Sequence, residues 1–264
     1  MSAAEAPDPA ALLAPVAAIA REAGAAIMAV YATDFEAREK DDASPVTDAD
    51  EAAEALIVPA LERLSPGVPI VAEEAAAAGD VPAVGDGPFW LVDPLDGTKE
   101  FLSRNGEFTV NIALIRDRRP ALGVVYAPAL DALYCGLAGD GATRSLKGGA
   151  AEPLSVRKPP ADGVTVIASR RHGDPAAIEA HLNGRAIADR VNAGSSLKFC
   201  RLAEGAADVY PRFARTMEWD TAAGQAVLEA AGGLVTEADG LPFRYAKNPI
   251  FENPHFIAWG GLRP

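Results

Sequence analysis

The chain has 264 residues, of which 49% are hydrophobic and 23% charged, so it is long and apolar enough to fold around a conventional core. Its 24 Lys and Arg against 37 Asp and Glu give a formal net charge of −13. Proteins that coat DNA or RNA need a basic face, so no nucleic-acid polymer is expected as a partner. This composition also excludes disordered, fibrous and disulfide-scaffold proteins.

The first predicted elements are two helices. Asp8, followed by a proline, predicts a helix N-terminus, and apolar residues keep helical spacing from there to Val30. A second helix is predicted from Asp48, whose side chain would cap it while Glu51 reaches back to complete a capping box. Pro59 is expected to kink this helix or end it early.

The rest of the chain predicts an α+β half followed by an α/β half. Apolar runs predict strands at 68–72, 89–92, 108–115, 122–127 and 132–137, the last three as an antiparallel meander. Residues 139–163 are rich in Gly, Pro and Lys, so we expect one domain over 1–150 and a second over 151–264. In the second, strands at 164–168, 186–191, 207–210, 234–236 and 255–259 alternate with helices at 174–182, 195–204 and 219–231.

Nothing in the first 15 residues has the pattern of a signal peptide, and the most apolar early run, 10–19, contains Pro15 and is followed by charged residues. Cys135 and Cys200 fit no CxxC pattern and are expected to be buried thiols in a reducing compartment. We therefore expect a soluble cytoplasmic protein, with peripheral association at the inner face of the cell membrane as the alternative.

The segment 89–101, FWLVDPLDGTKEF, is the most informative one. An apolar strand ends there, and Asp93 and Asp96 follow three residues apart. Pro94 disfavours helix at Asp93, so we expect a turn that brings both carboxylates and the Leu95 carbonyl to one point. Hard cations such as Mg²⁺ prefer this all-oxygen set, although an ordinary polar turn would have the same residues.

The residues after these carboxylates are suited to a phosphate. Gly97 permits close backbone approach, and the amides of Gly97 and Thr98 are suited to receive an anion. The haloacid-dehalogenase phosphatases offer an alternative, since they also end a strand with Asp before Gly-Thr. Their pattern is Asp-x-Asp-Gly-Thr, whereas two residues separate the carboxylates here, which would reorient the first one.

Further acidic clusters lie at Glu73-Glu74, in the segment 44–50 (SPVTDAD) and at Trp219-Asp220. Adjacent carboxylates at the ends of buried strands repel one another, and a bound cation relieves that repulsion. These clusters favour a metal site over a plain turn.

Together these motifs resemble the inositol monophosphatase superfamily. The resemblance is carried by DPLDGT, by Glu73-Glu74 and by WDTAAG at 219–224. Three longer strings, TKEF at 98–101, NGEFTVNIAL at 105–114 and GSSLKFC at 194–200, resemble its CysQ branch, the 3'(2'),5'-bisphosphate nucleotidases. Inositol monophosphatases proper usually have Thr-x-Asn-Phe in place of TKEF. The match runs from about residue 40 to residue 256.

The resemblance implies a layered αβαβα sandwich and a set of site residues. It implies that two or three Mg²⁺ are held by Glu73, Asp93, Asp96, Asp220 and the Leu95 carbonyl. It also implies that Asp50 and Thr98 orient the attacking water, that Gly97 and Thr98 hold the scissile phosphate, and that Glu74 lies behind the ligands.

A second anion site is predicted at 194–198, where a glycine turn enters a helix. Ser195, Ser196 and Lys198 are expected to bind substrate there, together with Asp220, with Lys198 pointing into the cleft while Leu197 and Phe199 pack inward. Lys99, Arg201 and Arg212 are further cations that would help to reverse the local negative charge.

The leading hypothesis is a Mg²⁺-dependent enzyme that removes the 3'-phosphate of adenosine 3',5'-bisphosphate, giving AMP and phosphate and clearing a by-product of sulfate assimilation. A second reaction would convert 3'-phosphoadenosine 5'-phosphosulfate to adenosine 5'-phosphosulfate. We expect lithium sensitivity, a small-molecule substrate, no obligatory protein partner and a monomer or homodimer. The alternatives are a phosphatase of inositol or other sugar phosphates, and a non-catalytic, metal-stabilised binding or scaffold protein.

Overall fold

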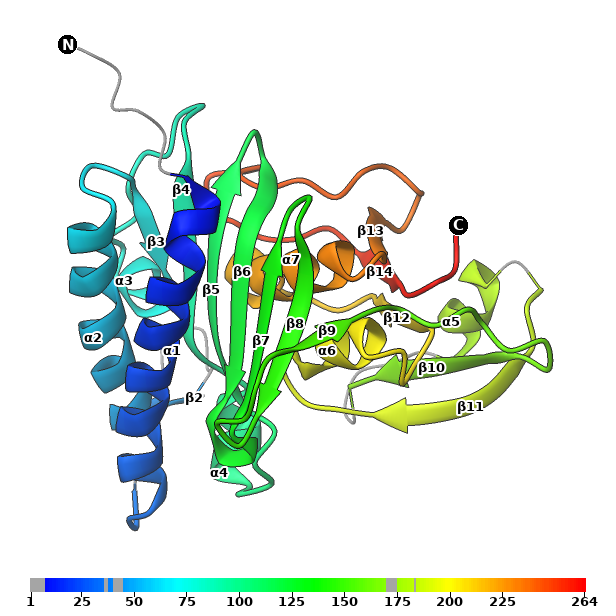
Figure 1. Ribbon diagram of the computed structural model, residues 1–264, viewed down its shortest axis with the longest axis horizontal. Helices are drawn as coiled ribbons and strands as arrows, with labels where there is room; N and C mark the ends of the chain where they lie inside the picture. Colours follow the sequence, from blue (N-terminus) through cyan, green and yellow to red (C-terminus); the bar gives the residue numbers. More distant parts are fainter. Residues whose placement is uncertain (1–7, 36–37, 40–44, 170–174, 183) are drawn as a thin grey trace.

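A computed structural model describes residues 8–35, 38–39, 45–169, 175–182 and 184–264. These residues form the layered αβαβα sandwich that the sequence predicts (Figure 1). Helices α1 (Pro9–Tyr31) and α2 (Asp48–Leu64) cover one face of the larger sheet. Helices α6 (Leu197–Ala203) and α7 (Ala222–Ala230) lie between the two sheets, and α5 (Pro175–His181) packs on the outer face of the smaller one.

The larger sheet has seven strands in the order β3-β4-β5-β6-β7-β8-β9, all antiparallel to their neighbours except the parallel pair β3–β4. The strands are β3 (Ile70–Ala72), β4 (Phe89–Asp96), β5 (Thr109–Arg116), β6 (Arg119–Ala127), β7 (Ala132–Leu137), β8 (Gly141–Leu146) and β9 (Glu152–Leu154). The predicted meander is confirmed as β5–β6–β7. The last strand of this sheet follows residue 150, and the division into domains at that point stays a prediction.

The smaller sheet has five strands in the order β11-β10-β12-β14-β13, with β10 parallel to both of its neighbours and β14 antiparallel to both of its own. The strands are β10 (Val164–Ala168), β11 (Ile187–Asn192), β12 (Val209–Arg212), β13 (Leu234–Glu237) and β14 (Phe256–Trp259). The remaining short elements are β1 (Arg38–Glu39), β2 (Pro45–Val46), α3 (Glu73–Ala77), α4 (Thr98–Leu102), η1 (Pro128–Leu130) and η2 (Glu218–Asp220).

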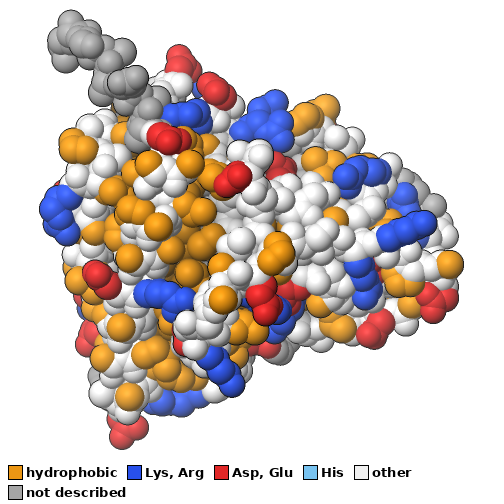
Figure 2. Space-filling model, in the orientation of Figure 1, with side chains coloured by type: hydrophobic (Ala, Val, Ile, Leu, Met, Phe, Trp, Pro, Cys, Tyr) orange, Lys and Arg blue, Asp and Glu red, His pale blue; other side chains and the backbone are white. Residues whose placement is uncertain are grey.

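Helix α1 is long and apolar enough, by length and composition alone, to cross a membrane. Figure 2 shows hydrophobic side chains gathered on the face where it lies. In the structure, however, Leu12, Val16 and Ile27 are buried in the cluster between α1, α2 and the larger sheet. Helix α1 therefore contributes to the hydrophobic core.

The capping of α2 differs from the prediction. Thr47, one residue earlier, is the N-cap: its Oγ1 accepts from the amide of Ala49 at 3.2 Å, and its own amide donates to Asp50 Oδ2 at 2.8 Å. Asp50 therefore closes the capping box, whereas Glu51 forms an ion pair with Arg38 at 3.0 Å.

Helix α2 also continues through Pro59 to Leu64, so the expected early end is wrong. Pro59 lies on the exposed face of the helix, beside the equally exposed Ala55. Water can therefore satisfy the Ala55 carbonyl that the proline leaves without a partner.

The later helices begin or break where polar side chains bind backbone. The helix expected from residue 195 begins at Leu197, and the one expected over 219–231 is divided into η2 and α7, with Thr221 between them. The Thr221 hydroxyl donates to the Glu218 carbonyl at 3.1 Å, which closes η2. Asp174, expected to start α5, and Ser44 lie outside the described residues.

Candidate active site

The DPLD segment forms a β-bulge and not the expected turn. Strand β4 continues to Asp96, with Asp93 opposite Asn111 and Asp96 opposite Thr109 on β5. Three steps along β4 thus face two steps along β5, so β4 carries one extra residue. A bulge redirects side chains without ending the strand, which is how Asp93 and Asp96 come to lie at one end of the sheet. The Leu95 amide donates to Asp93 Oδ1 at 3.0 Å and fixes the bulge.

Four carboxylates from three separate segments share this end of the sheet. Burial raises the pKa of Asp93 well above its usual range, and the neighbouring charges of Glu73, Asp96 and Asp220 raise it further. The pKa of Asp220 is also raised well above its usual range, first by burial and then by Asp96 and Glu73. Burial raises the pKa of Asp96 as well, against the opposing effect of Lys198. The ionised forms of Asp93 and Asp220 are therefore disfavoured here, and a cation bound between the carboxylates would favour them.

This donor set fits Mg²⁺. The carboxylates supply hard oxygen ligands, and the Leu95 carbonyl lies in the same bulge. Within the described part of the chain, no three His, Cys, Asp or Glu side chains form a group that could hold a metal ion by themselves. Mg²⁺ is ordinarily held by one or two carboxylates together with water and phosphate oxygens, so an open arrangement suits it.

Asp50 and Thr98 lie next to each other, as expected. Thr98 Oγ1 is 3.3 Å from Asp50 Oδ1 and 3.4 Å from the Leu95 carbonyl oxygen. The Thr98 hydroxyl can donate one hydrogen bond, and its lone pairs can accept hydrogen bonds from another group. Asp50 is 1% exposed, and its other oxygen is held by the amide and hydroxyl of Thr47 at 2.8 and 2.7 Å. The α2 cap therefore fixes the carboxylate that faces Thr98.

Gly97 joins the bulge to α4 in a left-handed conformation, with φ of 92°. A Cβ at this position would lie 3.3 Å from both the Glu107 carbonyl oxygen and the Ser195 Cβ. Any other residue here would therefore have a strained backbone conformation and a Cβ crowded against Glu107 and Ser195. Glycine is required because these two segments approach the backbone so closely.

The turn at 194–196 differs from the expected anion site, because the amides of Gly194 and Ser196 are already bound to side chains of the protein. The amide of Gly194 donates to Glu107 Oε2 at 2.7 Å, and the amide of Ser196 donates to Asp96 Oδ2 at 2.6 Å. The Ser196 hydroxyl donates to the Asp220 carbonyl at 2.8 Å. Ser196 is 1% exposed and is not among the described residues that line the pocket, so it lies behind the site wall.

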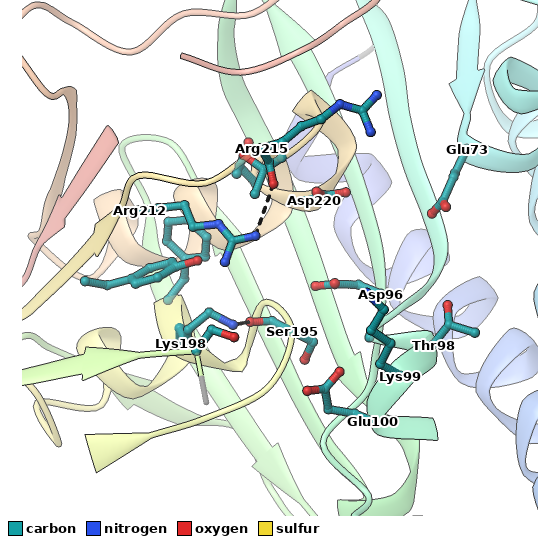
Figure 3. Close-up of a pocket in the computed structure, with 16 residues that line it drawn as sticks. Glu73, Asp96, Thr98, Lys99, Glu100, Ser195, Lys198, Arg212, Arg215 and Asp220 are labelled. Carbon is teal, nitrogen blue, oxygen red and sulfur yellow. Dashed lines mark hydrogen bonds between the residues drawn. The ribbon is translucent and has the colours of Figure 1, made fainter. Parts of the chain in front are cut away.

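The pocket itself is a cleft of about 330 Å³ with two chemically different walls (Figure 3). Glu73, Asp96 and Asp220 lie along one wall, and Lys198 and Arg212 lie opposite. Its remaining described lining includes Gly97, Thr98, Lys99, Glu100, Ser195, Tyr210 and Arg215. A cleft of this kind can hold cations on one side and anionic groups of a substrate on the other.

Some polar atoms of the basic wall have no hydrogen-bond partner among the described residues and are available to a ligand. Lys198 Nζ donates to the Ser195 carbonyl at 2.6 Å and lies 5.3 Å above the Tyr210 ring. Burial lowers the pKa of Lys198 to about 8, against the opposing charge of Asp96. Arg212 donates to the Arg215 carbonyl at 3.1 Å, but its buried Nε has no hydrogen-bond partner among the described residues. The buried Ser195 hydroxyl is unpartnered there too.

The inositol monophosphatase family model matches residues 8–258 of the chain. The chain belongs to this family. The proteins named 3'(2'),5'-bisphosphate nucleotidase CysQ from Salmonella typhimurium and Escherichia coli K12 are 45% and 46% identical to it over 249 and 242 residues. These matches cover 93% and 90% of this chain and 98% and 95% of the relatives. The expected resemblance to the CysQ branch is confirmed.

Solved structures of the family agree with the layered fold. The crystal structure of CysQ from Bacteroides thetaiotaomicron matches with a TM-score of 0.80 and 36% identity, covering 96% of this chain and 98% of that one. Inositol monophosphatase from Anabaena matches with a TM-score of 0.75 and 28% identity, covering 96% and 91%. The layered sandwich that the resemblance implied is therefore confirmed as the architecture that this chain shares with solved members of the family.

Two positions of this family member matter to the site and were not predicted from sequence. Asn111 Nδ2 donates to the Ser196 hydroxyl at 2.9 Å and lies 3.3 Å from Asp96 Oδ2. Asn111 is the one polar residue in the run VNIALI of β5, and this break in the apolar pattern could have identified it. Glu107 binds the Gly194 amide, and no local pattern indicated that contact.

The remaining expected residues are separated by the fold. The amide of Glu74 donates to Glu54 Oε2 at 2.8 Å. Glu54 of α2 therefore holds the first turn of α3, the helix whose first residue is Glu73. Arg201 is not among the described residues that line the pocket, and it pairs with Glu204 at 2.8 Å. Among the expected extra cations, Lys99 and Arg212 line the cleft.

Proposed function

We propose that this protein is a Mg²⁺-dependent phosphoric monoester hydrolase that converts adenosine 3',5'-bisphosphate to AMP and phosphate. The observation that carries the proposal is the pairing of an acidic wall with a basic wall across one cleft. The acidic wall suits cations that bind the scissile phosphate, and the basic wall suits a second phosphate. Relatives named 3'(2'),5'-bisphosphate nucleotidase support this choice of substrate.

The acidic wall would hold two or three Mg²⁺ through Glu73, Asp93, Asp96, Asp220 and the Leu95 carbonyl. Bound there, the cations supply charge neutralisation for the phosphate and acidify the attacking water. Asp50 and Thr98 would orient that water and take its proton while the water oxygen bonds to phosphorus and the bond from phosphorus to the 3'-oxygen breaks. The departing 3'-oxygen would take up a proton from solvent and become the ribose hydroxyl. Gly97 precedes Thr98 in the chain, and these two residues would also hold the scissile phosphate.

On the basic wall, Lys198, Arg212 and the Ser195 hydroxyl would bind the 5'-phosphate. All three line the pocket, and Ser195 and Arg212 each carry a buried polar atom without a partner in the described structure. Such atoms are costly to leave unsatisfied, so a phosphate there would restore their lost hydrogen bonds. Hydrolysis of 3'-phosphoadenosine 5'-phosphosulfate would follow from the same contacts. We further propose a cytoplasmic enzyme without an obligatory protein partner, as a monomer or homodimer.

The test is phosphate release from four compounds, each with millimolar Mg²⁺ and with chelator. Adenosine 3',5'-bisphosphate should be the best substrate, and adenosine 3'-monophosphate, which lacks only the second phosphate, should be clearly worse. AMP carries the 5'-phosphate alone and should not be hydrolysed. Faster release from inositol 1-phosphate would instead favour an inositol phosphatase. No release from any of them would favour a binding or scaffold protein.

A further inference from the structure

The loop 243–253 encloses the short η2 turn that carries Asp220. Glu218, at the start of that turn, has a completely buried side chain. It accepts from the amides of Ala246 at 2.6 Å and Lys247 at 3.2 Å, and it pairs with Lys247 Nζ at 3.0 Å. In return, the Glu218 amide donates to the Phe251 carbonyl at 2.7 Å. The turn and the loop are therefore joined in both directions.

Asn253 closes the other side of the turn. Its Nδ2 lies 2.6 Å from the Met217 carbonyl and 3.2 Å from the hydroxyls of both Thr216 and Thr221. Met217 is the residue whose amide donates to Asp220 Oδ2 at 2.9 Å. The chain on either side of Asp220 is thus held by one amide side chain, 7% exposed.

Lys247 connects these two contacts. Its ammonium bonds Glu218 and lies 3.3 Å from Asn253 Oδ1, and it also donates to the Arg244 carbonyl. It lies 4.4 Å above the Phe243 ring and 5.2 Å above the Tyr245 ring. An ammonium with this many partners in a mostly buried place orders the groups around it.

We propose that Lys247 and Asn253 are positioning residues that set where the Asp220 carboxylate lies in the cleft. Lys247 does this by compensating the buried Glu218 charge, and Asn253 by fixing the backbone on both sides of Asp220. The inference rests on the proposed function in so far as Asp220 is taken as a metal ligand. Neither residue lines the described cleft, so they act through Asp220 and not on substrate.

The test is direct Mn²⁺ binding, followed by the electron paramagnetic resonance signal of the free ion, beside steady-state kinetics and thermal unfolding. Lys247→Met should weaken Mn²⁺ binding and lower kcat by roughly 10–100-fold, the usual effect of removing a residue that orients a metal ligand. KM for the nucleotide should change little, since the basic wall is untouched. Lys158→Met, which makes the same substitution at an exposed lysine, is the control. It should leave Mn²⁺ binding, kcat and the unfolding temperature the same as in the protein without substitutions.

A double variant separates charge compensation from simple packing. Glu218→Gln with Lys247→Met removes both charges, so Mn²⁺ binding should recover to within about threefold of the unchanged protein, since the uncompensated charge is gone. Failure to recover would overturn the charge role of Lys247. If Lys247→Met lowers only the unfolding temperature and leaves Mn²⁺ binding unchanged, the positioning role is wrong.

Asn253→Ala provides an independent arm if Lys247→Met does not fold. It should weaken Mn²⁺ binding by roughly tenfold or more, and unchanged binding would overturn the role of Asn253. An unchanged protein that binds no Mn²⁺ at all would contradict the proposed function and not this inference, so the two failures are distinguishable.

Discussion

The amide of Ser196 donates a 2.6 Å hydrogen bond to Oδ2 of Asp96, a residue one hundred positions earlier in the chain. This bond joins the DPLD bulge of the larger sheet to the turn that precedes α6. The same turn carries the Ser196 hydroxyl bond to the Asp220 carbonyl. The acidic wall is therefore assembled from both halves of the chain, and a change on either side reaches the same carboxylates.

Asp96→Asn should nearly abolish phosphate release. The substitution removes a charge from the acidic wall, and we expect a loss of at least ~10²-fold in turnover, comparable to removing one group that stabilises a transition state. Adding Asp93→Asn should cost less than its separate effect, because groups that act as a unit are not additive. Initial rates at saturating nucleotide measure both. Near-normal turnover of either single variant at millimolar Mg²⁺ would remove these residues from the metal site.

Lithium should inhibit the enzyme at fixed ionic strength. A small monovalent cation can occupy a Mg²⁺ position among the carboxylates while supplying half the charge next to the phosphate. Initial rates are measured as LiCl replaces KCl, which serves as the control for ionic strength. Rates that do not change along this series would argue against a cation site of the kind proposed.

Lys198→Ala should act selectively on the bisphosphate. A charge-assisted hydrogen bond contributes about 1.5–3 kcal/mol, so kcat/KM for adenosine 3',5'-bisphosphate should fall by roughly 10–150-fold. The slower hydrolysis of an inositol monophosphate should barely change, because that substrate has no second phosphate. Arg201→Ala, on the same helix but paired with Glu204 outside the cleft, is the control. An equal loss on both substrates would mean that Lys198 is structural or catalytic.

The metal-free protein should be more stable in mild acid than at neutral pH. An acid whose pKa is higher in the folded protein than in the unfolded chain favours folding when protonated. For Asp93 and Asp220 this stabilisation is complete below the ordinary carboxylate pKa of about 4 and is lost as pH rises through their raised values. Thermal unfolding in chelator should therefore give a higher Tm near about pH 5 than near pH 7.5.

Millimolar Mg²⁺ should reverse that loss, because it binds the ionised carboxylates of the folded state. At neutral pH the Tm should rise with Mg²⁺, and Asp93→Asn should reduce both the pH dependence and the Mg²⁺ effect. A Tm that is insensitive to pH in chelator and to Mg²⁺ would show that these carboxylates are not held together as the structure places them.

Much of the architecture follows from local patterns. The predicted meander, the α1 cap at Asp8 and most strands of both sheets occur close to where the sequence predicts them, because caps and apolar spacing act within a few residues. The error in the capping of α2 occurs where two local signals competed. Thr47 and Asp48 both have capping side chains, and Thr47 becomes the cap because Asp50 can close the box from the third helical position.

The sequence by itself determined the family, since the motifs DPLDGT, Glu73-Glu74 and WDTAAG identify it without any coordinates. Only the tertiary structure decided how they meet. Pro94 indicated a turn, but pairing with β5 holds both ends of the segment and makes it a bulge. Likewise, the amides of Gly194 and Ser196 bind Glu107 and Asp96, whereas the buried Nε of Arg212 on the opposite wall has no hydrogen-bond partner among the described residues. These outcomes depend on strand register and on packing between segments about a hundred residues apart, which no local spacing encodes.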